Sequence, residues 1–226
     1  MTRRTMLALA ATLWLGNAAS TLRADEFAID NSHTGVVFRI SHMGLSHTYG
    51  RFNKIAGGYT LEAGKPEAST FNIAIDASSI DTNDAKRDEH LSGPDFLNAG
   101  EFPAITFKST KVVPKKVDDG IVLEVTGNLT MHGETRPVTL MLKKLGEGPG
   151  PMGNDFRTGF DTQTTLKRSE FGMTKMVGPI GDDVEIMISF EGVRKDAAAT
   201  GATTPAKSKR VVAAAKPKPV VVAAKR

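Results

Sequence analysis

The stretch from Ile121 to Leu140 reads I-V-L-E-V-T-G-N-L-T-M-H-G-E-T-R-P-V-T-L. Apolar and polar residues alternate through its first half, which is the two-residue period of a strand with one buried face. Gly133 can take a positive φ directly after His132, and the alternation then resumes towards Leu140. The stretch therefore predicts an antiparallel hairpin with one apolar face, which more strands of the same kind must cover.

Further alternating segments occur on both sides of this hairpin. They are Phe27–Asp30, Val36–Ser41, Tyr49–Leu61, Phe71–Asp76, Ile105–Val113, Phe156–Lys167 and Val184–Arg194. One short helix is expected, beginning at a cap on Asp81 or Thr82 and ending at Ser92 before Gly93-Pro94. Turns are expected at Asp118-Asp119-Gly120 and in the Gly/Pro-rich stretch 146–154, which is predicted to be a flexible loop. The fold class is therefore all-β, with eight or nine largely sequential antiparallel strands.

Both ends of the chain differ from the middle. Residues 1–24 carry two early arginines, an apolar run from Met6 to Leu15 and then small residues, which is the layout of a secretory signal peptide. Residues 195–226 consist mainly of Ala, Val, Lys, Pro and Thr without an aromatic residue, and they predict a disordered basic tail. The region 25–194 is expected to be the folded domain. Cleavage after Ala24 and export from the cytoplasm are predicted.

Charge and cysteine content narrow the function. The tail has a net charge of +7, whereas residues 25–194 carry 18 basic and 24 acidic residues, a net charge of −6. An acidic domain argues against binding to nucleic acid, because phosphate contacts need clustered cations. The chain has no cysteine, which excludes disulfides, thiolate ligands and thiolate nucleophiles. For the tail, the alternatives are a solvated segment and electrostatic contact with anionic membrane or cell-wall polymers.

Glycines inside the strand-like segments indicate a barrel. They are Gly50, Gly57, Gly58, Gly127 and Gly159, and glycine in a strand marks bulges, corners or close backbone approach. A barrel of about eight strands is either filled by side chains or holds one small ligand. Because these positions lack bulk, we expect the interior of the barrel, its lumen, to retain space.

Ordered motifs along the domain resemble the YceI-like polyisoprenoid-binding proteins of the bacterial periplasm. The motifs are Asp30-x-x-His33, His42-x-Gly44, Gly50-Arg51-Phe52, Ser79-Ile80-Asp81-Thr82, Arg87-Asp88-x-His90-Leu91, Phe102-Pro103, Phe107-Lys108-Ser109, Gly127-x-Leu129-Thr130-x-His132-Gly133, Gly159-Phe160 and Arg168-Ser169-x-Phe171-Gly172-Met173. The resemblance spans about 27–192. It implies a lipocalin-like, extended antiparallel barrel that holds a long prenyl lipid, such as a polyprenol or a ubiquinone-like molecule, in its lumen.

The apolar faces of the strands provide the candidate ligand-binding residues. They are Phe38, Ile40, Phe52, Phe107, Leu123, Val125, Gly127, Leu129, Met131, Val138, Leu140, Phe160 and Ile186. Such residues would point inward in any barrel, either as ligand contacts or as core, and the resemblance favours ligand contacts. Burial of a long prenyl chain predicts tight retention with weak selectivity for the headgroup.

Polar residues give weaker signals. The five histidines form no helical i, i+4 pair or carboxylate cluster in the sequence, so hydrogen-bonded structural roles are expected and no metal site. No serine nucleophile motif occurs, so no catalytic residue and no cofactor are assigned.

The main hypothesis is a periplasmic, non-enzymatic carrier of a long-chain isoprenoid or other lipid. The alternatives are an enzyme acting on such lipids through His90 or His132, and a filled barrel serving in adhesion or stress response. A homodimer is left open, because the apolar patch it needs cannot be placed from sequence.

Overall fold

The computed structural model describes residues 24–117 and 120–195. The predicted leader up to residue 23, the predicted turn at Asp118-Asp119 and the predicted tail from residue 196 lie outside these residues. The described strands are β1 (Ala24–Ile29), β2 (Gly35–His42), β3 (Ser46–Phe52), β4 (Ile55–Glu62), β5 (Thr70–Asp76), β6 (Ile80–Asp81), β7 (Ala104–Val117), β8 (Gly120–Met131), β9 (Glu134–Pro149), β10 (Phe156–Lys167) and β11 (Ile180–Arg194). The helices are α1 (Ala85–Ser92) and the 3-10 turns η1 (Asn31–His33), η2 (Pro66–Ala68), η3 (Ala77–Ser79) and η4 (Arg168–Phe171). Within these ranges, no helix has the length and apolar character that a membrane crossing requires.

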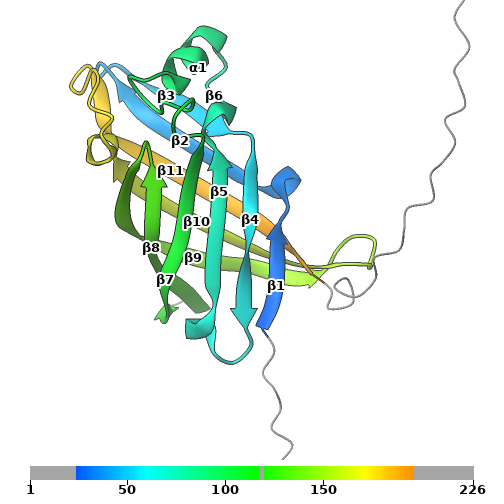
Figure 1. The fold of residues 1–226 in the computed structure, drawn as a ribbon. Helices are drawn as coiled ribbons and strands as arrows, with labels where there is room; N and C mark the ends of the chain where they lie inside the picture. The colour runs from blue at the N-terminus through cyan, green and yellow to red at the C-terminus, as the bar shows by residue number, and fades with distance from the viewer. Residues whose placement is uncertain (1–23, 118–119, 196–226) are drawn as a thin grey trace, which may run out of the picture. The chain divides into compact units, whose positions relative to one another are not determined.

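The strands form one antiparallel sheet that closes on itself (Figure 1). The ring order is β1-β4-β5-β7-β8-β9-β10-β11, and pairing of β1 with β11 closes the ring. Eight strands therefore make a closed barrel, and α1 is the one α-helix in the described part of the chain. This confirms the predicted fold class.

The remaining strands, β2, β3 and β6, extend the sheet at one end of the barrel. The long strand β11 makes this possible, because it pairs with β1 through Gly192–Arg194 and with β2 through Ile180–Ser189. Strand β3 pairs with β2, and β6 pairs with β3. Helix α1 follows β6 and lies at the same end, which we call the α1 end (Figure 1).

Residues 121–140 lie in the hairpin formed by β8 and β9. Met131 pairs with Glu134, so His132 and Gly133 form a two-residue turn, with φ values of 53° and 78°. Positive φ at both central residues is the conformation that matches the twist of a tight hairpin. The predicted turn at Gly133 is confirmed.

The predicted continuous run from Tyr49 to Leu61 is wrong, because the chain breaks between β3 and β4. The amide of Asn53 donates to the carbonyl oxygen of Ser79 at 3.0 Å, and the amide of Lys54 donates to Ser79 Oγ at 3.1 Å. These bonds divert the backbone from its neighbours in the sheet. As a result, β3 pairs with β2, while β4 pairs with β1.

Two other boundaries differ from the sequence-based predictions. The predicted loop 146–154 is strand up to Pro149, because residues 146–149 pair with 156–159, and the turn is confined to 150–155. The predicted helix cap at Asp81 or Thr82 is also wrong. The Asp84 carboxylate caps α1 by accepting hydrogen bonds from the amides of the second and third residues that follow it, and the helix ends before Gly93 as predicted.

Candidate functional site

Two clusters of buried side chains occupy the barrel. The first cluster contains Phe27, Tyr59, Phe71, Val112, Leu123, Val125, Leu142, Phe160 and Phe190. The second cluster contains Ala77, Ile80, Leu97, Ile105, Phe171 and Met173, with residues of α1 and its following loop packed against it. The first cluster is dominated by stacked and edge-to-face aromatic rings, such as Phe160 on Phe190 at 5.3 Å between centroids. One part of the barrel is thus filled by side chains.

The thirteen predicted ligand-binding residues fall into three groups. Leu123, Val125 and Phe160 are buried in the first cluster, where Phe107 and Leu140 also pack. Phe38, Phe52, Leu129 and Met131 are partly buried against the second cluster. Ile40, Gly127, Val138 and Ile186 belong to neither cluster. Contact of the thirteen residues with a ligand stays a prediction. The strand faces that carry them point inward, as the alternation in the sequence predicted.

The glycines do not leave the space that the sequence suggested. A methyl group added at Gly127 would meet the ring of Phe107 and the carbonyl oxygen of Lys108, and one added at Gly50 would overlap the ring of Phe38. At Gly57 the neighbouring atoms are backbone. These three glycines allow close approach of rings and strands, so they are not evidence of an open lumen.

Between the two clusters lies a set of inward positions that we call the middle band. It comprises Gly127, Val138, Thr162, Thr164 and Ile186. Along β10, Phe160 belongs to the first cluster and Leu166 packs on the second, so the two threonines lie between the clusters. Paired residues of an antiparallel sheet share a face, and Val138 pairs with Gly127 as Thr164 pairs with Ile186. Val138 and Ile186 are only partly buried, so the band contains apolar side chains that protein does not fully cover.

Sequence reasoning missed Thr162 and Thr164, because the candidate ligand-binding residues were taken from the apolar residues of the strands. The signal was present in the spacing. Both residues lie at even steps from Phe160, which the alternation had already placed inside.

The middle band borders an interruption in the barrel wall, which we call the seam. The ladder between β9 and β10 ends at the pair Lys143–Asp161. Beyond that pair, residues 134–142 of β9 are paired with β8 and not with β10, and residues 162–167 of β10 are paired with β11 and not with β9. Pro137 has no N–H and lies on this free edge of β9, where a strand tolerates proline.

The short helix η4 bridges the seam at the α1 end. His132 Nδ1 lies 2.9 Å from the carbonyl oxygen of Phe171, and Arg136 Nε donates to the carbonyl oxygen of Glu170 at 3.0 Å. Arg168 is 4% exposed, and burial lowers the pKa of its guanidinium. That guanidinium donates to four carbonyl oxygens, those of Met173 and Lys175 in the connection to β11 and those of Ile180 and Gly181 at the start of β11. The bridge is thus held by hydrogen bonds at both of its ends.

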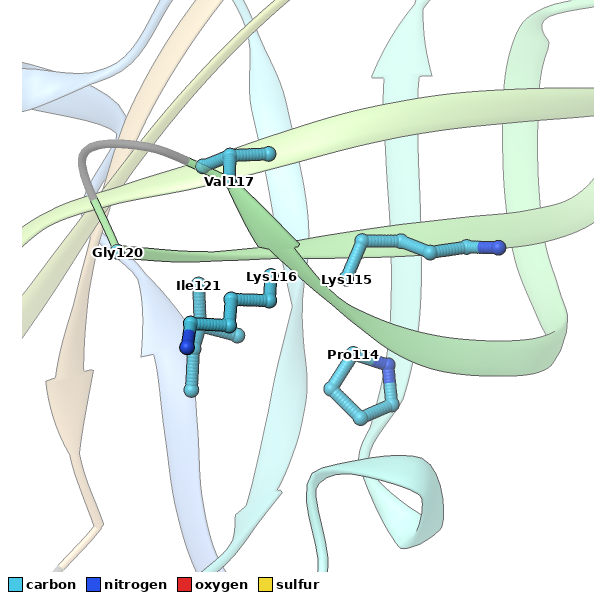
Figure 2. Close-up of a pocket in the computed structure, with 6 residues that line it drawn as sticks. All are labelled: Pro114, Lys115, Lys116, Val117, Gly120 and Ile121. Atoms are coloured by element: carbon cyan, nitrogen blue, oxygen red, sulfur yellow. The ribbon is translucent and has the colours of Figure 1, made fainter.

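Two hollows in the structure contain no residue of the middle band. One, of about 370 Å³, lies where the ends of β7 and β8 face each other, as Figure 2 shows. It is lined by Pro114, Lys115, Lys116, Val117, Gly120 and Ile121. The other, also about 370 Å³, is lined by Asn31, Lys54, Ile55, Ala56, Ala74, Ile75, Asp76, Pro103 and Ala104. Neither hollow contains a predicted ligand-binding residue.

A polar cluster lies where β1 ends. Asp30, His33 and Glu191 place ligand atoms within 4.8 Å of one another, so the sequence-based statement that no histidine joins a carboxylate cluster is wrong. The guanidinium of Arg157 already supplies the positive charge, with Nη1 at 2.7 Å from Asp30 Oδ2 and 3.2 Å from Glu191 Oε2. Hydrogen bonds from Ser32, then from His33 and Arg157, hold the pKa of Asp30 far below its usual value. The cluster joins β1, β10 and β11.

A second polar contact lies inside the first cluster. The hydroxyl of Tyr59 donates to the carbonyl oxygen of Thr158 at 3.1 Å and also contacts the Thr158 hydroxyl. Burial raises the pKa of Tyr59 to about 12. The tyrosine is therefore neutral at physiological pH and part of the filled core.

His90 and His132, the candidates of the enzyme hypothesis, have separate surroundings. His90 lies exposed on α1, 3.8 Å from Asp95 and edge-on to the ring of Phe96. His132 belongs to the β8–β9 turn, with its ring edge-on to Phe102 in addition to its bond to Phe171. The contacts of His132 match the turn-fixing role expected from the sequence.

Comparison with known proteins agrees with this architecture. A UPF0312 protein of Pectobacterium carotovorum is 42% identical over 196 residues, which cover 86% of this chain and 100% of that protein. The crystal structure of BcnA from Burkholderia cenocepacia has a TM-score of 0.63 at 24% identity, and covers 72% of this chain and 98% of its own. A polyisoprenoid-binding domain from Saccharophagus degradans, implicated in plant cell wall breakdown, has a TM-score of 0.55 at 11% identity, and covers 75% and 98%. The YceI-like domain matches residues 27–192. The chain therefore belongs to the YceI-like family, as the sequence motifs predicted.

Proposed function

We propose that the protein binds a long-chain isoprenoid lipid in the middle band and carries out no catalysis. The observation that carries the proposal is the incomplete burial of Val138 and Ile186, apolar side chains that face the interior of the barrel. Covering such surface with hydrocarbon stabilises the complex by about 25 cal/mol per Å². The structural similarity to a polyisoprenoid-binding domain supports the choice of a prenyl chain.

The filled first cluster limits how the lipid lies. Tyr59, Phe160 and Phe190 occupy the barrel beyond the middle band and are at most 7% exposed. A prenyl chain is therefore confined to the band and the half-buried residues towards the α1 end, such as Phe38, Met131 and Leu166. The seam between β9 and β10 offers the route between this space and the surroundings.

We also propose that the protein works in the periplasm. The proposal rests on the leader-like residues 1–24, with their early arginines and apolar run. An extracytoplasmic location suits a protein without cysteine, since its stability does not depend on the redox state of the compartment.

The decisive experiment is extraction of lipid from protein recovered from the periplasmic fraction of a Gram-negative host. Mass spectrometry of the organic extract should show a prenyl lipid in stoichiometric amount. Val138→Asp places a charge in the middle band and should abolish the bound lipid, because an ion is costly to bury beside hydrocarbon. The matched control is Thr139→Asp, which changes the exposed neighbour on the opposite face of β9.

Two results would contradict the proposal. One is a folded protein that is free of lipid and takes up none on addition, which would favour the filled-barrel alternative. The other is equal lipid content in the Val138 and Thr139 variants. Val138→Phe gives a second test, because it narrows the band without adding charge and should reduce the lipid content while the thermal melt stays cooperative. Protein found only in the cytoplasmic fraction would overturn the proposed location.

A further inference from the structure

One buried hydroxyl group in the barrel interior has no partner. Thr162 faces inward on β10 and is 6% exposed. Across residues 24–117 and 120–195, its Oγ1 is the buried side-chain nitrogen or oxygen atom left without a hydrogen bond. Buried polar groups of native proteins are nearly always hydrogen-bonded. Thr162 thus presents a donor and acceptor that the described chain does not satisfy.

Other threonines of the barrel do have partners. Thr158, four residues earlier on the same face of β10, is bonded to the hydroxyl of Tyr59. On the outer face, the hydroxyls of Thr126 and Thr139 lie 3.0 Å apart on paired strands. Thr162 therefore differs from these other threonines in its surroundings, which offer its hydroxyl no hydrogen-bond partner.

The position of Thr162 connects it to the seam. It is the first residue of β10 after the last pair with β9, which joins Asp161 to Lys143. On the other side, Thr162 pairs with Ile188 of β11. The hydroxyl therefore lies at the closed corner of the seam, where a molecule that enters between β9 and β10 meets the filled first cluster.

The surroundings of Thr162 select a neutral partner. The other residues of the middle band are glycine, valine, threonine and isoleucine, and none carries a charge. The guanidinium of Arg168 is engaged with four backbone carbonyl oxygens. A phosphate or diphosphate group at Thr162 would be an unpaired buried charge, which is strongly unfavourable. An uncharged oxygen, by contrast, needs only one hydrogen bond.

We propose that Thr162 Oγ1 hydrogen-bonds the oxygen of a neutral isoprenoid, an alcohol or a quinone, that reaches it through the seam. This inference rests on the proposed lipid binding and adds selectivity to it. The sequence predicted weak headgroup selectivity, whereas this contact distinguishes an oxygen-bearing isoprenoid both from the hydrocarbon and from the phosphorylated lipid.

The test compares ligands with and without the oxygen. Delipidated full-length protein competes for a radiolabelled polyprenol against unlabelled polyprenol, an isoprenoid quinone, a polyprenyl phosphate and a linear isoprenoid hydrocarbon of matched chain length. Wild type should prefer the alcohol or the quinone to both of the other lipids. Thr162→Val removes the hydroxyl at nearly constant volume and should weaken alcohol or quinone binding by about tenfold, with hydrocarbon binding unchanged. Thr162→Ser should restore most of the preference.

The control is Thr165→Val, which changes an exposed threonine on the outer face of the same strand and should leave every ligand unaffected. Equal effects of Thr162→Val on alcohol and hydrocarbon, or no effect on either, would overturn the inference while lipid binding itself stands. A higher melting temperature of Thr162→Val without a change in ligand preference would overturn it as well. Wild-type protein that binds none of the four lipids would refute the proposed function instead.

Discussion

At the scale of single residues, Asp30 is expected to make the stability of the protein depend on pH. Its carboxylate accepts hydrogen bonds from the Ser32 amide at 3.0 Å and the Ser32 hydroxyl at 2.6 Å, and from Arg157 Nη1 at 2.7 Å. These contacts lower the folded-state pKa, so the ionised form is favoured by folding. The stabilisation is present above the unfolded-state pKa of about 3.9 and is lost as the pH falls through the folded-state pKa.

Asp30→Asn should therefore lower the free energy of unfolding at pH 7 by about 1–2 kcal/mol, because a charged acceptor of several hydrogen bonds is replaced by a neutral one. The difference from wild type should shrink as the pH is lowered from about 4 to about 2. Urea unfolding at several pH values measures it. Ser32→Ala should show the same trend with smaller amplitude, and a difference that is constant from pH 7 to pH 2 would contradict the assignment.

Individual residues show what the sequence could predict of the site. The alternation placed Val125 and Phe160 inside, and both are at most 1% exposed. It could not show that the ring of Phe107 covers Gly127, because that contact joins two strands and depends on their register. Thr162 was missed for another reason: the candidates were taken from apolar residues, although the spacing of Thr162 from Phe160 indicated the inner face.

At the scale of elements, the start of helix α1 shows how well the preference for capping residues locates a helix boundary. The Asp84 carboxylate accepts hydrogen bonds at 3.1 Å from the amides of Lys86 and Arg87, which satisfies two donors of the first helical turn. Thr82, one of the predicted caps, instead receives the Nε–H of Arg87 at 2.7 Å. Several cap-forming residues in succession made the start of the helix ambiguous in the sequence.

Asp84→Ala should destabilise the protein by about 1 kcal/mol through loss of this cap. Thermal unfolding monitored by circular dichroism gives the measurement. Glu89→Ala is the matched control, since Glu89 is an exposed acidic residue in the middle of the same helix. Equal effects of the two substitutions would show that charge rather than capping is responsible.

Strand boundaries were harder to predict where hydrogen bonds to distant residues outweigh the preference of the local sequence for a loop or a strand. Gly146 and Gly148 suggested a loop, yet the backbone of β10 pairs with both and keeps them in β9. The break at Asn53 has the same origin, because the side chain and carbonyl of Ser79 compete for its amide. Both outcomes depend on residues distant in the sequence, which local patterns do not report.

At the scale of the whole molecule, the barrel closes through ladders of unequal length. The alternation predicted a barrel of about eight antiparallel strands, and the order of strands in the ring follows the chain apart from β2, β3 and β6. The seam was not predictable, because alternation continues through β9 and β10 whether or not the two strands are bonded to each other. Only the pairing itself shows that the ladder ends at Lys143 and Asp161.

The seam should be visible in amide hydrogen exchange resolved by NMR. In 134–142 and 162–167, amides that point to the bonded neighbour should be protected, and alternate amides that point into the seam should exchange quickly. Amides at the centre of β8, which is bonded to β7 and to β9, should be protected without alternation. Uniform protection of 162–167 would contradict an open seam, and lipid loading should slow the fast amides by excluding water.

An interrupted wall also exposes a barrel to a hazard, because free strand edges are templates for aggregation through strand addition. Residues 134–142 form such an edge, and Pro137 interrupts its row of donors while the charged side chains of Glu134 and Arg136 lie exposed beside it. Proline and charge are the features that deter an incoming strand. The same segment can therefore stay open to a lipid without recruiting a strand from another copy of the chain.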